Sequence, residues 1–342
     1  MTPAAPAPVF DHLVRLSDGT GLLEHARGAT PRRGHGYCLD DVARGLVVLA
    51  REPDLTAGLL RLLERYLAFV AHAQDSTGAF HNRLSYDRRW QDTAGTGDWW
   101  GRALWGLGTV AARTTTPWLR DEALSCFELG AGQRSAWPRA MAFATLGAGE
   151  VLERYPDHHG ARALLKAGAA ARPAPDPQWP WPEPRLGYAN AVLAEASIVA
   201  GRHQHDDTLV SDGLSLLDWL LRVQTRDGHL SLVPVGGWRP PEPRPAFDQQ
   251  PIETAALADA CARAWSLTAD PRWATGLRRG VAWFTGDNDV GVPMMDAGTG
   301  GGFDGLESTT VNVNQGAEST LALLSTLQHG RGLDGGGGRA RT

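Results

Sequence analysis

Apolar residues recur with a helical period along most of the chain, whereas the alternation typical of β-strands is nearly absent. After a proline-rich N-terminal arm, this periodicity predicts an all-α chain. The expected helices lie at residues 39–51, 55–73, 98–112, 117–129, 137–154, 158–171, 187–201, 206–224, 249–268, 271–285 and 314–329.

The predicted helices alternate between two kinds. Six of them open on polar residues, and each of the first five is followed by a more evenly amphipathic helix, such as the one around 59–67. We interpret the polar-headed helices as an inner ring and the others as an outer ring, which predicts an (α/α)6 barrel, or toroid. No linker divides the pattern, so we expect a single domain over residues 1–334, and the glycine-rich segment 335–342 is expected to be a disordered tail.

The openings of the six polar-headed helices combine carboxylates, amides and tryptophans. They read Leu39-Asp40-Asp41, Gly97-Asp98-Trp99-Trp100, Trp137-Pro138-Arg139, Tyr188-Ala189-Asn190, Gln249-Gln250-Pro251-Ile252-Glu253 and Asn314-Gln315-Gly316-Ala317-Glu318. Paired carboxyl groups can cleave a glycosidic bond, and indole faces can stack on sugar rings. The same polar residues are also ordinary helix caps, so capping is the competing interpretation at each position.

Four long irregular segments each precede a polar-headed helix, at 75–97, 172–186, 225–248 and 286–313. We therefore expect them to share one face of the barrel. Loops of this length in a compact domain are usually functional or disordered, and their tryptophan and acidic content favours function.

Composition excludes several classes of protein. The formal net charge of the 342 residues is −5, and the basic residues are scattered, which argues against a nucleic-acid partner. The three cysteines lie far apart and are expected to be reduced and buried. The sequence shows neither a signal peptide nor an apolar run long enough to span a membrane, so we expect a cytoplasmic protein.

The motif Thr30-Pro31-Arg32-Arg33-Gly34-His35-Gly36-Tyr37-Cys38-Leu39-Asp40-Asp41-Val42-Ala43-Arg44 resembles a family of bacterial (α/α)-toroid carbohydrate-active proteins. These proteins are similar to glycoside hydrolases, are often mislabelled as glycosyltransferases and are found near mannoside phosphorylases. The resemblance continues at Gly101 to Trp105, Gln249 to Glu253 and Asn312 to Thr320. It implies an oligosaccharide substrate and a functional association with a glycosyltransferase or a glycoside phosphorylase.

The candidate catalytic residues are two among Asp41, Asp98, Glu183 and Glu253, with Glu318 next. Asp41 is predicted to face the barrel axis while its neighbour Asp40 caps the helix. Tryptophans beside Asp98 would desolvate its carboxyl and raise its pKa toward the use of a general acid. Glu183 lies in a loop that three prolines restrict and two tryptophans flank, which favours a role in the site over a surface connection.

The candidate substrate-binding residues share aromatic faces, amides or charges near the helix openings. Trp181 is expected to stack on sugar, so its replacement by alanine should weaken affinity by roughly 1–3 kcal/mol. Gln249 is expected on the face of Glu253, with Gln250 projecting elsewhere. The full set is His35, Tyr37, Asp40, Trp99, Trp100, Arg102, Arg139, Trp179, Trp181, Tyr188, Asn190, Gln249, Gln250, Asn314 and Glu318.

The chemistry expected from these residues is glycoside hydrolysis by paired carboxyl groups. The resemblance implies a manno- or gluco-configured oligosaccharide, with β-linkage and inversion favoured. No cofactor or metal site is expected. A sugar epimerase or isomerase of the same fold is the first alternative and would use His35 or His81 as acid and base. A lyase would use Tyr188 and Arg139, and a non-catalytic sugar-binding partner of a glycosyltransferase would need none of the acids.

Overall fold

A computed structural model describes residues 5–168, 176 and 178–335. The described helices are α1 (Asp11–Leu16), α2 (Leu39–Arg51), α3 (Ala57–Ala73), α4 (Asp98–Arg113), α5 (Pro117–Ala131), α6 (Pro138–Arg154), α7 (His159–Gly168), α8 (Ala191–Gln204), α9 (Asp207–Val223), α10 (Pro251–Thr268), α11 (Pro271–Thr285) and α12 (Ala317–Gly335). Among these helices, none combines the length and the apolar character needed to cross a membrane.

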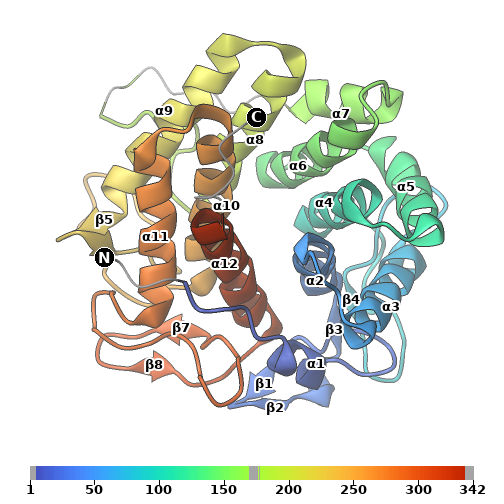
Figure 1. Cartoon of the computed structure of the whole chain (residues 1–342), viewed down its shortest axis with the longest axis horizontal. Coiled ribbons are helices and arrows are strands. Elements are labelled where there is room, and N and C mark those ends of the chain that lie inside the picture. The colour runs from blue at the N-terminus through green and yellow to red at the C-terminus, as the bar shows by residue number, and fades with distance from the viewer. Residues whose placement is uncertain (1–4, 169–175, 177, 336–342) are drawn as a thin grey trace.

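The helices form two concentric rings (Figure 1). In the inner ring α2, α4, α6, α8, α10 and α12 each contact the next, and α12 returns to α2. Each of α3, α5, α7, α9 and α11 packs outside the inner helix that precedes it, while the short α1 packs against α12. This is the predicted (α/α)6 barrel, and the fold prediction is confirmed.

The predicted helix boundaries agree with the structure to within a few residues. Helices α2 and α11 occupy the predicted ranges, whereas α8 begins at Ala191 and α12 continues to Gly335. The residues 169–171 of the predicted 158–171 helix, part of the predicted 172–186 loop and residues 336–342 of the predicted tail lie outside the described residues.

Short β-ladders join the loops at the starts of the inner helices. The strands are β1 (Ala26–Arg27), β2 (Thr30–Pro31), β3 (Tyr37–Cys38), β4 (Arg83–Leu84), β5 (Thr225–Arg226), β6 (His229–Leu230), β7 (Gly305–Leu306) and β8 (Val311–Asn312), paired in that order and antiparallel. Between β5 and β6, Asp227 and Gly228 adopt φ angles of 52° and 93°. This left-handed turn suits Asp and Gly and closes a two-residue hairpin.

The inner helices α4 and α6 approach each other closely because glycines line their contact. A Cβ atom added to Gly147 would lie 2.3 Å from the carbonyl oxygen of Leu104, and one added to Gly108 would lie 2.3 Å from the carbonyl oxygen of Gly147. A side chain at either glycine would push the two helices apart.

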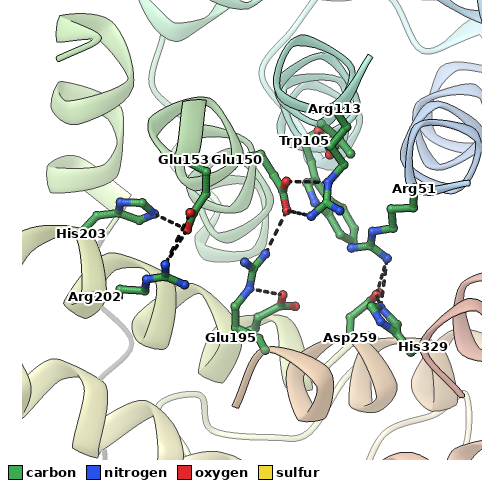
Figure 2. Close-up of polar contacts among 12 residues, drawn as sticks. Arg51, Trp105, Arg113, Glu150, Glu153, Glu195, Arg202, His203, Asp259 and His329 are labelled. Carbon is green, nitrogen blue, oxygen red and sulfur yellow. Dashed lines mark hydrogen bonds and ion pairs between the residues drawn. The ribbon is translucent and has the colours of Figure 1, made fainter. Parts of the chain in front are cut away.

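A network of buried charges crosses the barrel toward the C-terminal ends of the inner helices (Figure 2). Arg51 of α2 pairs with Asp259 of α10 at 2.6 Å, and His329 of α12 lies 2.6 Å from the same carboxylate. Glu150 of α6 accepts hydrogen bonds from Arg113 and Arg263 at 3.0 Å each, and the two guanidinium groups hold its pKa down at about 2. The network ties the six-helix ring together away from the loop-bearing end.

Candidate active site

A cavity, here called the main cavity, lies where the inner helices begin. Its volume is about 480 Å³, within the range of ~300–1,000 Å³ typical of ligand pockets. It is lined by Glu24, His25, Cys38, Asp40, Asp41, Arg44, Asn82, Arg83, Asp98, Trp99, Tyr188, Gln250, Asp304, Asn312, Gly316, Glu318 and Ser319. Toward the barrel interior a cavity of about 50 Å³ follows, which is too small for a sugar ring.

Arg44 organises three of the carboxyl groups in this cavity. Its guanidinium donates to Asp40 and Asp41 at 2.6 Å each and lies 2.8 Å from the carboxylate of Glu318. Oxygens of these three carboxyls lie within 4.8 Å of one another, an arrangement that could also hold a metal ion. Arg44 pairs with all three carboxyl groups and brings one positive charge to the cluster.

Asp40 and Asp41 both face this cavity, so the prediction that Asp40 caps the helix is wrong. The N-cap of α2 is Cys38, and Asp40 instead lies 2.9 Å from Nε of the buried Arg102. Asp41 is only 4% exposed, and burial raises its pKa to about 8 against the opposing attraction of Arg44. Arg102, predicted to bind substrate, packs its guanidinium 3.9 Å from the centre of the Phe143 ring and does not line the main cavity.

Asp98, the first residue of α4, stands at the junction between the main cavity and a neighbouring cleft. Its carboxyl makes no hydrogen bond or ion pair with any other residue that the structure describes. Burial raises its pKa above the ordinary value, partly offset by Arg102. Its carboxyl can therefore donate or accept a hydrogen bond at the edge of the cavity, an environment that suits a general acid, and its catalytic role stays a prediction.

The neighbouring cleft has a volume of about 920 Å³ and continues from Asp98 toward α6. Trp99 and Tyr188 line both hollows, and Trp137 lines the cleft with 66% of its surface exposed. The indole nitrogen of Trp99 donates to the carbonyl oxygen of Phe80 at 2.7 Å, which fixes its ring. Aromatic faces therefore follow one another outward from the cavity.

Glu183 lies in the cleft but is paired with Arg139. The guanidinium donates to both carboxylate oxygens, at 2.6 and 2.8 Å, and also bonds the carbonyl oxygen of Tyr188. A bidentate pair of this kind is strong and geometrically specific. Both carboxylate oxygens of Glu183 therefore accept from Arg139, and the catalytic role of Glu183 stays a prediction. Trp179 donates to the Glu183 carbonyl oxygen and packs against Trp219.

Two of the tryptophans predicted to bind sugar belong to the core. Trp100 is fully buried, and its indole donates to the carbonyl oxygen of Gly130. Trp181 is 1% exposed and stacks on Trp219 at 5.9 Å between ring centroids. Neither ring offers a face to a ligand in this structure, which corrects the expectation that they stack on sugar.

The two glutamines before α10, both predicted to bind substrate, lie in different places. Because the helix begins at Pro251, Gln249 lies before it and is fully buried, where its amide donates to Asp289 at 2.6 Å. Gln250 lines the cavity instead. Glu253 is buried and accepts a hydrogen bond from Asn190 at 2.9 Å; burial raises its pKa to about 7, but neither residue lines the main cavity.

Loops near the N-terminus supply cavity residues that the sequence analysis did not single out. Glu24 and His25 face the cavity, whereas the predicted His35 is exposed and rests edge-on against the His25 ring at 4.7 Å. Tyr37 is buried and donates to Asp18 at 2.6 Å. The position of His25 shortly before the motif that contains His35 was the sequence signal that could have identified it as a cavity residue.

The segment before α12 closes the cavity on its far side. Asp304 accepts from the backbone of Gly316 at 2.7 Å and lines the cavity, whereas the predicted Asn314 accepts from Gly28 and anchors the loop. A Cβ on Gly302 would lie 2.4 Å from the carbonyl oxygen of Ser319. The glycine-rich loop 300–305 can therefore approach α12 closely.

Comparison with known proteins supports the fold. No protein-family model matches the sequence, and a search of curated proteins finds no match. Similar solved structures include a sugar epimerase from a ruminal bacterium (TM-score 0.70, 12% identity, 94% of this chain and 95% of that chain). They also include the cellobiose 2-epimerase of Spirochaeta thermophila (0.67, 13%, 95% and 94%) and a cellulase of C. cellulolyticum (0.63, 8%, 92% and 88%). At this identity the likeness shows a shared toroid.

Proposed function

We propose that the protein is a glycoside hydrolase that acts on a neutral oligosaccharide. The observation that carries the proposal is that one cavity contains two carboxyl groups in different environments. Asp98 has no partner among the described residues and a raised pKa, whereas Glu318 is held by Arg44. The two carboxyls begin helices α4 and α12, which flank α2 on either side. Glycosidic cleavage requires such a pair, one acid and one base or nucleophile.

In the proposed reaction Asp98 donates its proton to the leaving glycosidic oxygen as the bond to the anomeric carbon breaks. Glu318 accepts a proton from a water molecule that attacks the same carbon from the opposite face. The products are two shorter saccharides, and the new anomeric centre is inverted. Asp40 and Asp41 hold Arg44 in position to orient the Glu318 carboxylate.

The charge of the cavity favours an uncharged ligand. Six carboxyl-bearing residues line it in the described part of the chain, and with Asp41 and the proposed proton donor Asp98 neutral, four carboxylates remain against the arginines Arg44 and Arg83. A uronic acid or a sugar phosphate would meet this excess of carboxylates at short range. The neutral hydroxyls of a manno- or gluco-configured chain can instead donate to carboxylates and accept from guanidiniums.

A sugar epimerase is the second candidate, and His25 is the observation that favours it. A histidine can exchange a proton near neutral pH, and the His25 ring lines the cavity beside Glu24, 3.6 Å away. The previously considered His81 instead stacks on Trp90. A lyase is less favoured, because the Arg139 charge that would neutralise a uronate is already matched by Glu183.

The test is product formation from a panel of α- and β-linked manno- and gluco-oligosaccharides, followed by proton NMR as the reaction proceeds. Wild-type protein should release shorter sugars with inversion at the anomeric carbon. Asp98→Asn should lower the rate roughly 10²–10⁴-fold while affinity measured by calorimetry is retained. Asp121→Asn, an exposed acid on the outer helix α5, is the matched control and should be unchanged.

Other outcomes would replace the proposal with a named alternative. An epimerised sugar of unchanged length, lost in His25→Ala, would establish the epimerase. Binding without any turnover across the panel would support the non-catalytic protein that associates with a glycosyltransferase. Equal rates for wild type and Asp98→Asn would remove Asp98 from the reaction.

A further inference from the structure

We propose that the cavity binds the terminal unit of a saccharide chain and that the chain leaves through the cleft over Trp99 and Tyr188, with Trp137 as an outer binding platform. The inference rests on the proposed function in taking a saccharide as the ligand. It adds two features: recognition of a chain end, and a binding residue, Trp137, outside the catalytic cavity.

The cavity joins the neighbouring cleft on one side. On the side of α4 and α6 it shares Asp98, Trp99 and Tyr188 with the cleft. On the side of α12 and α2 it is walled by loops that are bonded to one another. Glu24 forms an ion pair with Arg83, and its carbonyl oxygen accepts from the backbone nitrogen of Ala317 at 3.0 Å.

The difference between the two sides of the cavity limits how a saccharide chain can be placed in it. A saccharide that crossed the cavity from one side to the other would have to displace the bonded wall, whereas one that ends in the cavity leaves along the existing cleft. The position of Asp98 at the junction then places the bond between the terminal unit and the next unit beside the proposed proton donor. The geometry therefore favours removal of terminal units over internal cleavage.

The exposed side chain of Trp137 has no evident role in stabilising the fold. It is the N-cap residue of α6, but its side chain makes no capping hydrogen bond, and 66% of its surface is exposed. Isolated exposed aromatic residues are common. Trp137, however, lines the same cleft as Trp99, Pro138 and Tyr188, so its ring belongs to a continuous surface on which successive sugars can stack.

The polar groups of the cleft suit an uncharged chain. Arg139 and Glu183 neutralise each other at 2.6 Å, and together they present donors and acceptors to hydroxyl groups. The guanidinium of Arg139 also lies 5.1 Å from the centre of the Tyr188 ring, which helps to hold that ring at the junction.

The experiment is an affinity series measured by calorimetry with manno- and gluco-oligosaccharides of increasing length, on wild type, Trp137→Ala and Trp118→Ala. Trp118 is the matched control, because it is also exposed, at 55%, but lies at the start of the outer helix α5 and lines neither hollow. Trp137→Ala should leave monosaccharide affinity unchanged and weaken binding of the longer chains about tenfold. Trp137→Phe should retain part of the increase in affinity with chain length, and Trp118→Ala should retain all of it.

Product analysis tests the chain-end feature separately. Early products should be terminal units alone, with no mixture of internal fragments. Equal losses for short and long chains in Trp137→Ala, or no loss at all, would overturn the role of Trp137, and early internal fragments would overturn the chain-end feature. If no sugar is cleaved but the affinity series still depends on Trp137, the hydrolase proposal fails while the binding inference stands.

Discussion

The protonation of Asp41 offers a quantitative test of the electrostatics at the proposed site. Two effects oppose each other at this carboxyl: burial favours the neutral acid, and Arg44, 2.6 Å away, favours the carboxylate. Burial prevails, because the pKa rises from the ordinary 3.8 to about 8. Asp41→Asn replaces the acid with a neutral group whose oxygen can still accept from Arg44.

The sign of the effect follows from proton linkage. Between pH 3.8 and about 8 the folded protein holds a proton on Asp41 that the unfolded chain has lost, so stability falls as pH rises through this window. From about pH 5 to about pH 8 the wild type should lose about 4 kcal/mol through this group. For a chain of 342 residues this corresponds to about 5–6 °C in Tm.

The assay is thermal unfolding of wild type and Asp41→Asn across this pH range, supported by urea unfolding at both ends. The two proteins should be equally stable near pH 5, and Asp41→Asn should become the more stable as pH approaches 8. Other groups that titrate in this range contribute to both proteins, so the difference isolates Asp41. Plots of Tm against pH that run parallel for the two proteins, or a variant that is less stable near pH 8, would refute the reasoning. Either result would mean that the attraction of Arg44 outweighs burial.

Two further predictions concern the barrel itself. Asp259→Asn should reduce the free energy of unfolding by about 3–5 kcal/mol in urea titrations, because it leaves the buried Arg51 guanidinium without its charged partner; an unchanged midpoint would show that the network does not stabilise the ring. Gly147→Ala should cost about 1–3 kcal/mol, because its Cβ would lie 2.3 Å from the carbonyl oxygen of Leu104, whereas Gly19→Ala, with no atom within 4 Å, should be neutral by the same measurement.

Most of the fold could be predicted from the sequence because helical periodicity is a local property. The polar-headed and amphipathic helices were distinguishable, and their alternation indicated two rings. The short helix α1 and the pairing of the two-residue strands were not predicted, since elements of that length are set by tertiary contacts rather than by a repeating pattern. The pairing of Tyr37 with Leu84 in β3 and β4, for example, joins segments far apart in the chain.

The candidate site was predicted in part. Asp41, Asp98 and Glu318 line one cavity, as a ring of helix openings implied. Burial could not be foreseen from composition: a tryptophan next to an acid, as at Trp181 and Glu183, has the same appearance in sequence whether it faces a ligand or the core. Ion-pair partners supplied by another element, such as Arg139 for Glu183, are likewise not visible in the local pattern.

The same six inner helices carry two different electrostatic environments, and this difference explains why the loop-bearing end can be a site. Toward the C-terminal ends, Arg51 and Asp259 pair within the ring, so the network there is internally matched. At the N-terminal ends carboxyls outnumber guanidiniums, and one of them, Asp98, is matched by no residue that the structure describes. A ligand that supplies hydrogen-bond donors to this end would complete an arrangement that the protein alone leaves incomplete. A chain of neutral hydroxyls supplies such donors without bringing a charge that the remaining carboxylates would repel.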